Sequence, residues 1–130
     1  MILVDTHVVI WLAEGGTQLS PAARAAIGGE RGRGDSLAIS GITLVELAVA
    51  YEKKRIILTV PLGTFLEETE SRFTVLPLTS RVCAAMSALP ASFPRDPADR
   101  LIAATAQVHG LRLVTADKSI RKSRAVPTVW

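Results

Sequence analysis

Short, strongly apolar runs alternate along the chain with longer segments in which apolar residues recur at helical intervals. The short runs are rich in leucine, isoleucine and valine and have the length of buried strands, whereas the longer segments have the spacing of helices that cover one face of a sheet. Strands are expected at residues 2–4, 37–40, 73–76, 112–115 and 127–129. Because such alternation is typical of βα units, the sequence predicts a three-layer α/β/α fold with a mainly parallel central sheet of four to five strands.

Capping residues and glycines mark the boundaries of the intervening helices. Ser20 and Pro21 provide a cap and a first-turn proline. The two glycines at 28–29 predict the end of the helix that Pro21 opens, so residues 30–35 are expected to form a mobile loop. The other helices are expected at residues 8–13, 43–54, 80–89, 96–109 and 118–122, and after Pro61. Because no repeat or linker interrupts this order, we expect a single domain over residues 1–130.

The amino-acid composition limits the kinds of protein that this chain can be. With 48% hydrophobic and 21% charged residues over 130 positions, the chain has the balance of a globular domain, and with 5% aromatic residues its core must be aliphatic. No apolar run approaches the ~18 residues of a membrane span, and the first residues lack the pattern of a signal peptide, so a cytoplasmic protein is expected. Cys83 is the only cysteine and lies in an apolar helical stripe, which excludes an internal disulfide and predicts a buried thiol.

Five acidic residues occupy positions that the predicted fold would bring together. They are Asp5, Glu46, Asp96, Asp99 and Asp117. Two of them follow strands directly and three lie near the starts of helices. In an open parallel sheet, ligands bind beyond the carboxyl ends of the strands, where the strand order reverses. Carboxylate oxygens are hard ligands suited to Mg²⁺ or Mn²⁺, so the sequence predicts a divalent-metal centre at this edge.

Each acid also has a purely structural explanation. Asp5, Asp96 and Asp117 are positioned to cap the helices that follow them, and Thr43 with Glu46 fits a capping box. Several carboxylates crowded together would repel one another, however, and no comparable set of cations is interleaved with them in the sequence. A bound divalent cation would relieve that repulsion. We therefore favour a joint site over a set of independent caps.

Basic residues collect in three clusters, whereas the acids fall at the candidate site, in a chain whose formal net charge is +3. The clusters are Arg31 and Arg33; Lys53, Lys54 and Arg55; and Lys118, Arg121, Lys122 and Arg124. Two explanations remain open for them. They are either the solvated ends of helices, or groups that steer the phosphates of a polyanion towards the acidic centre.

The acids lie within four sequence motifs. These are Val4-Asp5-Thr6-His7, Ile39-Ser40-x-Ile42-Thr43-x-x-Glu46-Leu47, Arg95-Asp96-Pro97-Ala98-Asp99-Arg100 and Leu113-Val114-Thr115-Ala116-Asp117. In this order the set resembles the PIN-domain nucleases, and in particular the VapC-type toxins of bacterial toxin–antitoxin pairs, over nearly the whole chain. The resemblance implies a PIN-like fold. One departure is Pro94, where many relatives carry histidine before the third motif.

The resemblance also implies roles for individual residues. The catalytic and metal-binding centre falls on Asp5, Glu46, Asp99 and Asp117. Asp96 matches an outer acid of the third motif and ranks below Asp99, because capping already accounts for it. Thr6 and Thr115 match hydroxyl residues that would orient a carboxylate or a water molecule. His7 is expected to pack or hydrogen-bond beside the site rather than to catalyse, and His109 carries no functional signal.

In function, the resemblance implies a metal-dependent endoribonuclease that uses Mg²⁺ or Mn²⁺ to hydrolyse RNA and acts as the toxin of a toxin–antitoxin pair. Its partners would be an RNA substrate, a cognate antitoxin and a second copy of the chain in a homodimer. Apolar residues beyond the needs of a small core support a partner surface. They are Val8, Ile10, Trp11, Leu12, Leu62, Phe65 and Leu66. The opposing possibility, that all of them are buried within the monomer, stays open.

Two other classes of protein compete with this interpretation. A phosphate-signalling receiver domain also binds Mg²⁺ with acids at strand ends, but it would carry an acid pair after the first strand and an acceptor aspartate after the third. Here Asp5 is followed by Thr6 and His7, and residues 76–79, after the third strand, contain no acid. The other competitor is a non-catalytic interaction module, and the complete set of acids argues against it.

Overall fold

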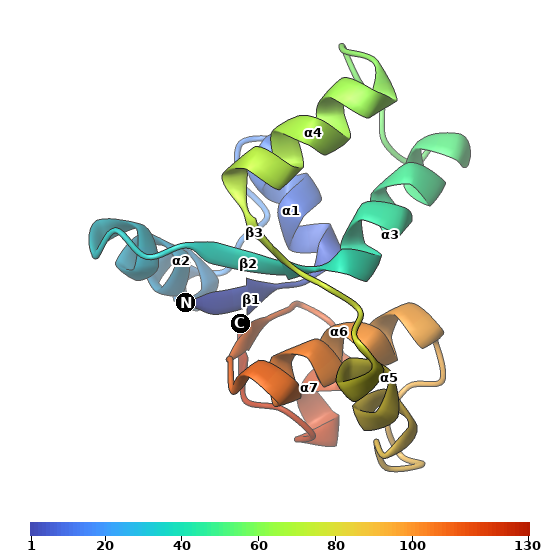
Figure 1. The fold of residues 1–130 in the computed structure, drawn as a ribbon. Coiled ribbons are helices and arrows are strands. Elements are labelled where there is room, and N and C mark those ends of the chain that lie inside the picture. Colours follow the sequence, from blue (N-terminus) through green and yellow to red (C-terminus); the bar gives the residue numbers. More distant parts are fainter.

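Five parallel strands form a single sheet in the computed structural model, which describes residues 1–130 (Figure 1). The strands are β1 (Ile2–Val4), β2 (Leu37–Ser40), β3 (Thr74–Leu76), β4 (Leu113–Val114) and β5 (Thr128–Val129). They lie in the order β3-β2-β1-β4-β5, and every neighbouring pair is parallel. The chain builds outward from β1 first on one side and then on the other, so the strand order reverses between β1 and β4. The predicted parallel sheet is confirmed.

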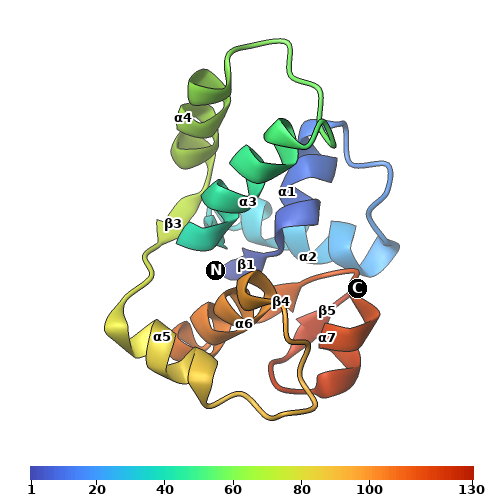
Figure 2. The same ribbon diagram turned by 90° about the vertical axis from the view of Figure 1, so that its right-hand side faces the viewer.

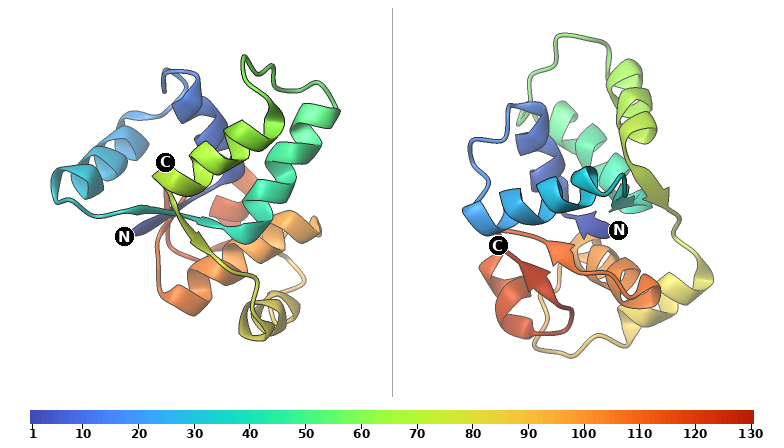
Figure 3. Two further views of the ribbon diagram at one scale, coloured as in Figure 1. Left: turned by 45° about the horizontal axis from the view of Figure 1, so that its top comes forward. Right: turned by 90° about the vertical axis from the view of Figure 1, so that its left-hand side faces the viewer.

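Seven helices cover the two faces of this sheet and give the predicted three-layer α/β/α arrangement. They are α1 (Thr6–Ala13), α2 (Pro21–Gly32), α3 (Gly41–Glu52), α4 (Leu62–Arg72), α5 (Ser80–Ser87), α6 (Pro97–His109) and α7 (Lys118–Ser123). Helices α1 to α4 lie on one side of the sheet and α5 to α7 on the other, as Figure 2 and Figure 3 show. None of the helices combines the length and the apolar character needed to cross a membrane.

The alternation of side chains along the strands divides the core into two layers. Ile2 and Val4 belong to a cluster of 11 buried residues on the side of α1, α2 and α3. Leu3, which lies between them, belongs to a cluster of 10 buried residues on the side of α6 and α7. Successive side chains of a strand point to opposite faces, so β1 contributes to both layers. Phe93 is the only aromatic side chain among the largest fully buried ones, and the core is aliphatic as expected.

Helix α2 is longer than the sequence predicts. It continues past the glycines at 28–29 to Gly32, so the prediction of a mobile loop at residues 30–35 is wrong for its first part. Glu30 accounts for the difference, because it is only 4% exposed and forms an ion pair with Arg33. A glycine lowers the stability of a helix by about 1 kcal/mol relative to alanine. The ion pairs of Glu30 with Arg33 and with the amino group of Met1 oppose that loss.

Cys83 is exposed on α5, so the prediction of a buried thiol is wrong. Val82 is the fully buried residue of this helix, and Met86, four residues later, is half-buried. Neighbouring residues of a helix point about 100° apart. Cys83 therefore falls outside the buried stripe that Val82 and Met86 define.

Candidate active site

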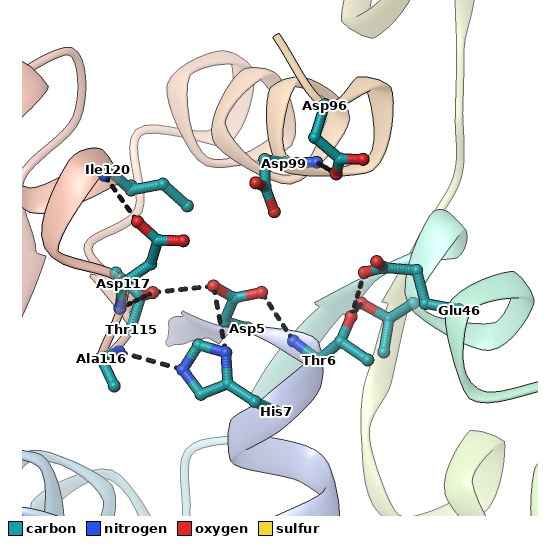
Figure 4. Close-up of polar contacts among 11 residues, drawn as sticks. Asp5, Thr6, His7, Glu46, Asp96, Asp99, Thr115, Ala116, Asp117 and Ile120 are labelled. Carbon is teal, nitrogen blue, oxygen red and sulfur yellow. Dashed lines mark hydrogen bonds and ion pairs between the residues drawn. The ribbon is translucent and has the colours of Figure 1, made fainter. Parts of the chain in front are cut away.

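The carboxyl ends of β1 and β4 meet the N-terminal ends of α3 and α6 at one edge of the sheet, beside the reversal of strand order. Four carboxylates from separate parts of the fold border one space there (Figure 4). They belong to Asp5 after β1, Glu46 in α3, Asp99 in α6 and Asp117 after β4. Parallel strands end at a common edge, and this is why residues far apart in the sequence meet. Asp96 lies at the rim of the same space.

Asp5 is buried, and both of its carboxylate oxygens are held. Oδ1 accepts a hydrogen bond from the backbone N–H of Thr6 at 2.8 Å, and Asp5 is the N-cap of α1. Oδ2 accepts a hydrogen bond from the Thr115 hydroxyl at 2.7 Å and lies 3.6 Å from Nδ1 of His7. Groups that follow β1 and β4 therefore fix the orientation of this carboxylate together. The Thr115 hydroxyl lies where its motif indicates an orienting group.

Glu46 is held by a pair of hydroxyl groups. Thr6 Oγ1 donates a hydrogen bond to Glu46 Oε1 at 2.6 Å and lies 3.0 Å from Thr43 Oγ1. Because the single hydroxyl proton of Thr6 goes to the carboxylate, Thr43 is the donor in the second bond.

The capping box predicted for Thr43 and Glu46 is not formed. Ser40 is the N-cap residue of α3, and no side chain caps that end of the helix. Thr43 is instead fully buried and orients Thr6, a role that the sequence interpretation missed. The only sign of it in the sequence is the three-residue spacing of Thr43 and Glu46, which places both on one helix face.

Asp99 lies half-buried in the first turn of α6, and its carboxylate points towards Asp5 (Figure 4). Burial, with a further contribution from the charges of the neighbouring acids, raises the pKa of Asp99 from 3.8 to about 7. Burial also raises the pKa of Glu46, against the lowering effect of its hydrogen bond with Thr6. Burial is the main cause of both pKa shifts, and the like charges of the neighbouring acids add to it.

Asp96 and Asp117 both cap helices. Asp96 is exposed, and its Oδ2 accepts a hydrogen bond from the backbone N–H of Asp99 at 3.0 Å. Asp117 Oδ1 accepts a hydrogen bond from the backbone N–H of Ile120 at 3.0 Å, and the N–H of Asp117 donates to Thr115 Oγ1 at 3.1 Å. The other carboxylate oxygen of Asp117 is directed into the shared space (Figure 4). Capping and metal binding are thus compatible for Asp117.

The site has the donor chemistry of a divalent-metal centre. No lysine or arginine forms an ion pair with any of the five acids, and only His7 lies beside one of them. No group of three or more His, Cys, Asp or Glu side chains stands close enough together to hold an ion by itself. The carboxylate oxygens are the ligand type of Mg²⁺, which keeps several water molecules and takes one or two carboxylates directly. The hard oxygen donors fit Mn²⁺ equally.

The two histidines have different surroundings. His7 Nε2 accepts a hydrogen bond from the backbone N–H of Ala116 at 3.0 Å, and its ring packs against Trp11. His7 therefore packs and hydrogen-bonds beside the site, as expected. His109 is exposed at the C-terminal end of α6, whereas Asp99 lies at the other end of that helix.

Similarity to known proteins extends over the whole site. A family model described as the PIN domain matches residues 2–125, which include all five acids. Ribonuclease VapC22 of Mycobacterium tuberculosis is 42% identical over 131 aligned positions, which cover 99% of this chain and 98% of that protein.

Solved structures share the fold at lower identity. VapBC2 of Rickettsia felis, bound to a DNA fragment from its promoter, has a TM-score of 0.71 at 17% identity and covers 98% of this chain and 97% of its own. A toxin–antitoxin complex from Klebsiella pneumoniae has a TM-score of 0.64 at 23% identity and covers 97% of this chain and 95% of its own. The family model and the 42% identical relative both span nearly the entire chain. The chain therefore belongs to the PIN-domain family and is a homologue of the VapC ribonucleases.

Proposed function

We propose that the chain is a metal-dependent endoribonuclease that hydrolyses RNA phosphodiester bonds with Mg²⁺ or Mn²⁺ and acts as the toxin of a toxin–antitoxin pair. The observation that carries this proposal is the convergence of four carboxylates with no lysine or arginine paired to them. A 42% identical ribonuclease supports the reaction. Membership of the PIN-domain family argues against a receiver domain. We further propose that residues 1–130 form one domain. We also propose that the protein acts in the cytoplasm, where RNA is present.

Particular residues would hold the ion. Asp5 and Asp99 are the direct ligands in this proposal, because Asp5 has the most firmly oriented carboxylate and Asp99 the one whose ionised form gains most from a cation. Glu46 and Asp117 would hold the ion's water molecules or a second ion. When bound, the ion supplies neutralisation of the phosphodiester charge and activation of water. The hydroxyl groups described above keep the carboxylates in place.

Glu46 is the group that we expect to accept a proton. Its Oε1 is engaged by Thr6, which leaves Oε2 available. Burial raises the pKa of Glu46, and a carboxylate with a raised pKa is a stronger base than an ordinary glutamate. As the attacking water forms its bond to phosphorus and the bond to the leaving oxygen breaks, Glu46 takes the water proton and the leaving oxygen takes a proton from solvent water. Thr6 holds the carboxylate in a fixed position during this transfer.

An apolar groove of about 440 Å³ lies between α1, α4 and the segment 56–60 that follows α3. Ten of its 16 lining residues are hydrophobic, among them Leu12, Ile57, Val60 and Phe65. Ile57 is 93% exposed, so a large apolar side chain at the groove lacks a partner in the monomer. We assign the groove to an apolar segment of the antitoxin. A solved toxin–antitoxin complex with the same fold supports this assignment.

The apolar residues that the sequence singled out divide between core and groove. Val8 is fully buried, and Trp11 and Leu66 are half-buried against the same core cluster. Ile10 and Phe65 line the groove. Some of these apolar residues are therefore buried within the monomer, and others line the open groove.

A second apolar surface lies along α3. Val45 and Val49, one turn apart, are 54% and 37% exposed. Leu78, which is 40% exposed, lies beside Gly41 at the start of the same helix. We assign this surface to a homodimer, because a patch along one helix can face its own copy across a two-fold axis.

The proposal is tested with the purified full chain and a labelled RNA. We expect cleavage in Mg²⁺ or Mn²⁺, none after chelation with EDTA, and recovery when the ion is added back. The protein encoded beside this gene should inhibit the reaction when it is added in equal amount. Cleavage that continues in EDTA would contradict metal dependence, and the absence of cleavage with either ion would contradict the ribonuclease assignment.

A further inference from the structure

His7 contacts both of the segments that carry acids of the site (Figure 4). Its Nε2 accepts a hydrogen bond from the backbone N–H of Ala116 at 3.0 Å, directly before Asp117. Its Nδ1 lies 3.6 Å from Asp5 Oδ2. One imidazole ring therefore bridges the residue after β1 and the turn after β4.

The hydrogen bond assigns the tautomer of this ring. A backbone N–H only donates, so Nε2 must offer its lone pair to Ala116. The proton of the neutral imidazole is then on Nδ1, the atom that faces the Asp5 carboxylate. At 3.6 Å the Nδ1 atom of His7 and Oδ2 of Asp5 do not form a hydrogen bond, so this side of the bridge is an electrostatic contact.

A second bridge runs parallel to the first. Thr115 Oγ1 donates to Asp5 Oδ2 at 2.7 Å and accepts a hydrogen bond from the Asp117 N–H at 3.1 Å. Thr115 connects the Asp117 N–H to Asp5 Oδ2 through two hydrogen bonds, and His7 connects the Ala116 N–H to the same oxygen through one hydrogen bond and one electrostatic contact. Together the two bridges fix the position of Asp117 relative to Asp5.

Aromatic packing holds the ring in this orientation. The ring centroid of His7 lies 4.8 Å from that of Trp11 and 6.4 Å from that of Trp130. The two tryptophans lie 5.7 Å apart, and they are the only tryptophans of the chain. The three rings therefore form one aromatic cluster that contacts the imidazole, while both of its nitrogen atoms face polar partners.

We propose that His7 is a positioning residue whose neutral imidazole sets the spacing of Asp5 and Asp117 and thereby the affinity of the site for its divalent ion. The last step rests on the proposed function, whereas the bridge itself does not. Groups that orient metal ligands through hydrogen bonds typically change metal affinity or activity about 10-fold to 100-fold when they are removed. We expect an effect of about tenfold here, because Thr115 retains the parallel bridge.

Two substitutions separate the hydrogen bond from the packing. His7→Phe keeps an aromatic ring beside the tryptophans but has no acceptor for the Ala116 N–H. His7→Gln loses the ring but offers an amide oxygen at the distance of Nε2. We expect His7→Phe to lower the affinity for Mn²⁺ about tenfold, as measured by calorimetry without RNA. The same variant should lower kcat about tenfold with little change in KM. His7→Gln should stay within about threefold of the wild type in Mn²⁺ affinity and in kcat. In the isotope-labelled metal-free wild type, a nitrogen-to-nitrogen coupling across the Ala116–His7 hydrogen bond should be detectable by NMR.

The outcomes distinguish the inference from the proposed function. Absence of the coupling in the wild type contradicts the bridge, and Mn²⁺ affinity of His7→Phe equal to that of the wild type contradicts its effect on the metal. A better result for His7→Phe than for His7→Gln would show that the ring only packs. If the coupling is present but the wild type binds no Mn²⁺ and cleaves no RNA, the proposed function fails while the bridge remains.

Discussion

Asp99 shows at the scale of one residue how the acidic site is built. It is half-buried, it borders a space shared with three other carboxylates, and its pKa is raised to about 7. Above this pKa the half-buried carboxylate is ionised without a paired lysine or arginine, and this opposes folding of the metal-free protein. A carboxylate that destabilises the metal-free protein is typical of a residue retained for binding or chemistry.

The raised pKa of Asp99 predicts how the stability of the metal-free protein depends on pH. Because the folded-state pKa lies above the ordinary value of 3.8, the folded protein binds more protons than the unfolded chain between about pH 4 and pH 7. The free energy of unfolding should therefore fall as the pH rises through this range and level off above it. Asp99→Asn removes this contribution, so in EDTA its Tm should exceed that of the wild type by about 2–6 °C at pH 8 and by less at pH 4.5. Thermal unfolding at both pH values measures it, and a wild type that is the more stable at pH 8 would contradict it.

Asp96 offers a matched test of capping against metal binding. Asparagine caps helices as well as aspartate does, so Asp96→Asn should leave the N-terminal end of α6 intact and keep RNA cleavage within about fivefold of the wild type. Asp96→Ala should lower the free energy of unfolding by about 1 kcal/mol, because the hydrogen bond to the Asp99 N–H is removed. If Asp96→Asn loses activity as fully as Asp99→Asn, Asp96 touches the ion and our ranking of the two acids is wrong.

At the scale of elements, helix α7 places positive charge next to the acidic site. The helix starts directly after Asp117 and carries two exposed lysines, Lys118 and Lys122. Basic residues in its last turn suit the negative end of a helix, so both earlier explanations, helix ends and phosphate steering, still apply. The position beside Asp117 favours a contact with the RNA backbone.

A double substitution tests that contact. Lys118→Gln with Lys122→Gln should raise KM for RNA several-fold and reduce the dependence of log affinity on log salt by about 0.7 for each RNA phosphate that a lysine no longer neutralises. The matched control is Lys53→Gln with Lys54→Gln, since these residues follow the far end of α3, about 18 Å from its start at the site. If both double substitutions change KM and the salt dependence equally, the lysines of α7 act only through the overall charge of the protein.

Much of the fold was predictable from local patterns, and the motifs also indicated Thr6 and Thr115 as orienting hydroxyls, but the partners of Thr43 and His7 were not predictable. The parallel sheet and the meeting of the acids follow from short apolar runs and from the geometry of parallel sheets, whereas the strand order is known only from the structure. By contrast, the Thr6–Thr43 and His7–Ala116 hydrogen bonds join residues 37 and 109 positions apart, and no periodicity encodes them. Cys83 was misplaced because an apolar pattern fixes the face of a helix only approximately, and exposure is decided by the neighbouring elements.

At the scale of the whole molecule, the apolar groove and the acids of the active site come from different elements, whereas Val45 and Val49 of the α3 surface flank Glu46 on one helix. The groove is lined by α1, α4 and residues 56–60, while the α3 surface comprises Val45, Val49 and Leu78. Neither set includes an acid of the site. Cleavage, inhibition by the antitoxin and dimerisation should therefore be separable by mutation.

Two charge substitutions, one in the groove and one on the α3 surface, test this separation. Ile57→Asp should abolish inhibition by the neighbouring gene product while the protein remains a dimer. The aspartate would have to lose its hydration when an apolar segment of the antitoxin fills the groove. Val45→Asp should give a monomer in light scattering at micromolar concentration while inhibition is kept. RNA cleavage by Ile57→Asp without the antitoxin should equal that of the wild type. A monomeric wild type that the neighbouring gene product does not inhibit would contradict both surface assignments.

The most direct test of the central claim is metal-dependent RNA cleavage by Asp99→Asn beside the control Glu67→Gln, an exposed acid of α4 outside the site. The asparagine has nearly the same shape as aspartate but no charge for a divalent ion. We predict that Asp99→Asn folds with unchanged circular dichroism, is at least as thermally stable as the wild type in EDTA, and loses cleavage in Mn²⁺ by a factor of about 100 or more. Glu67→Gln should cleave at the wild-type rate. Full cleavage by folded Asp99→Asn would contradict the assignment of this acidic centre as the active site.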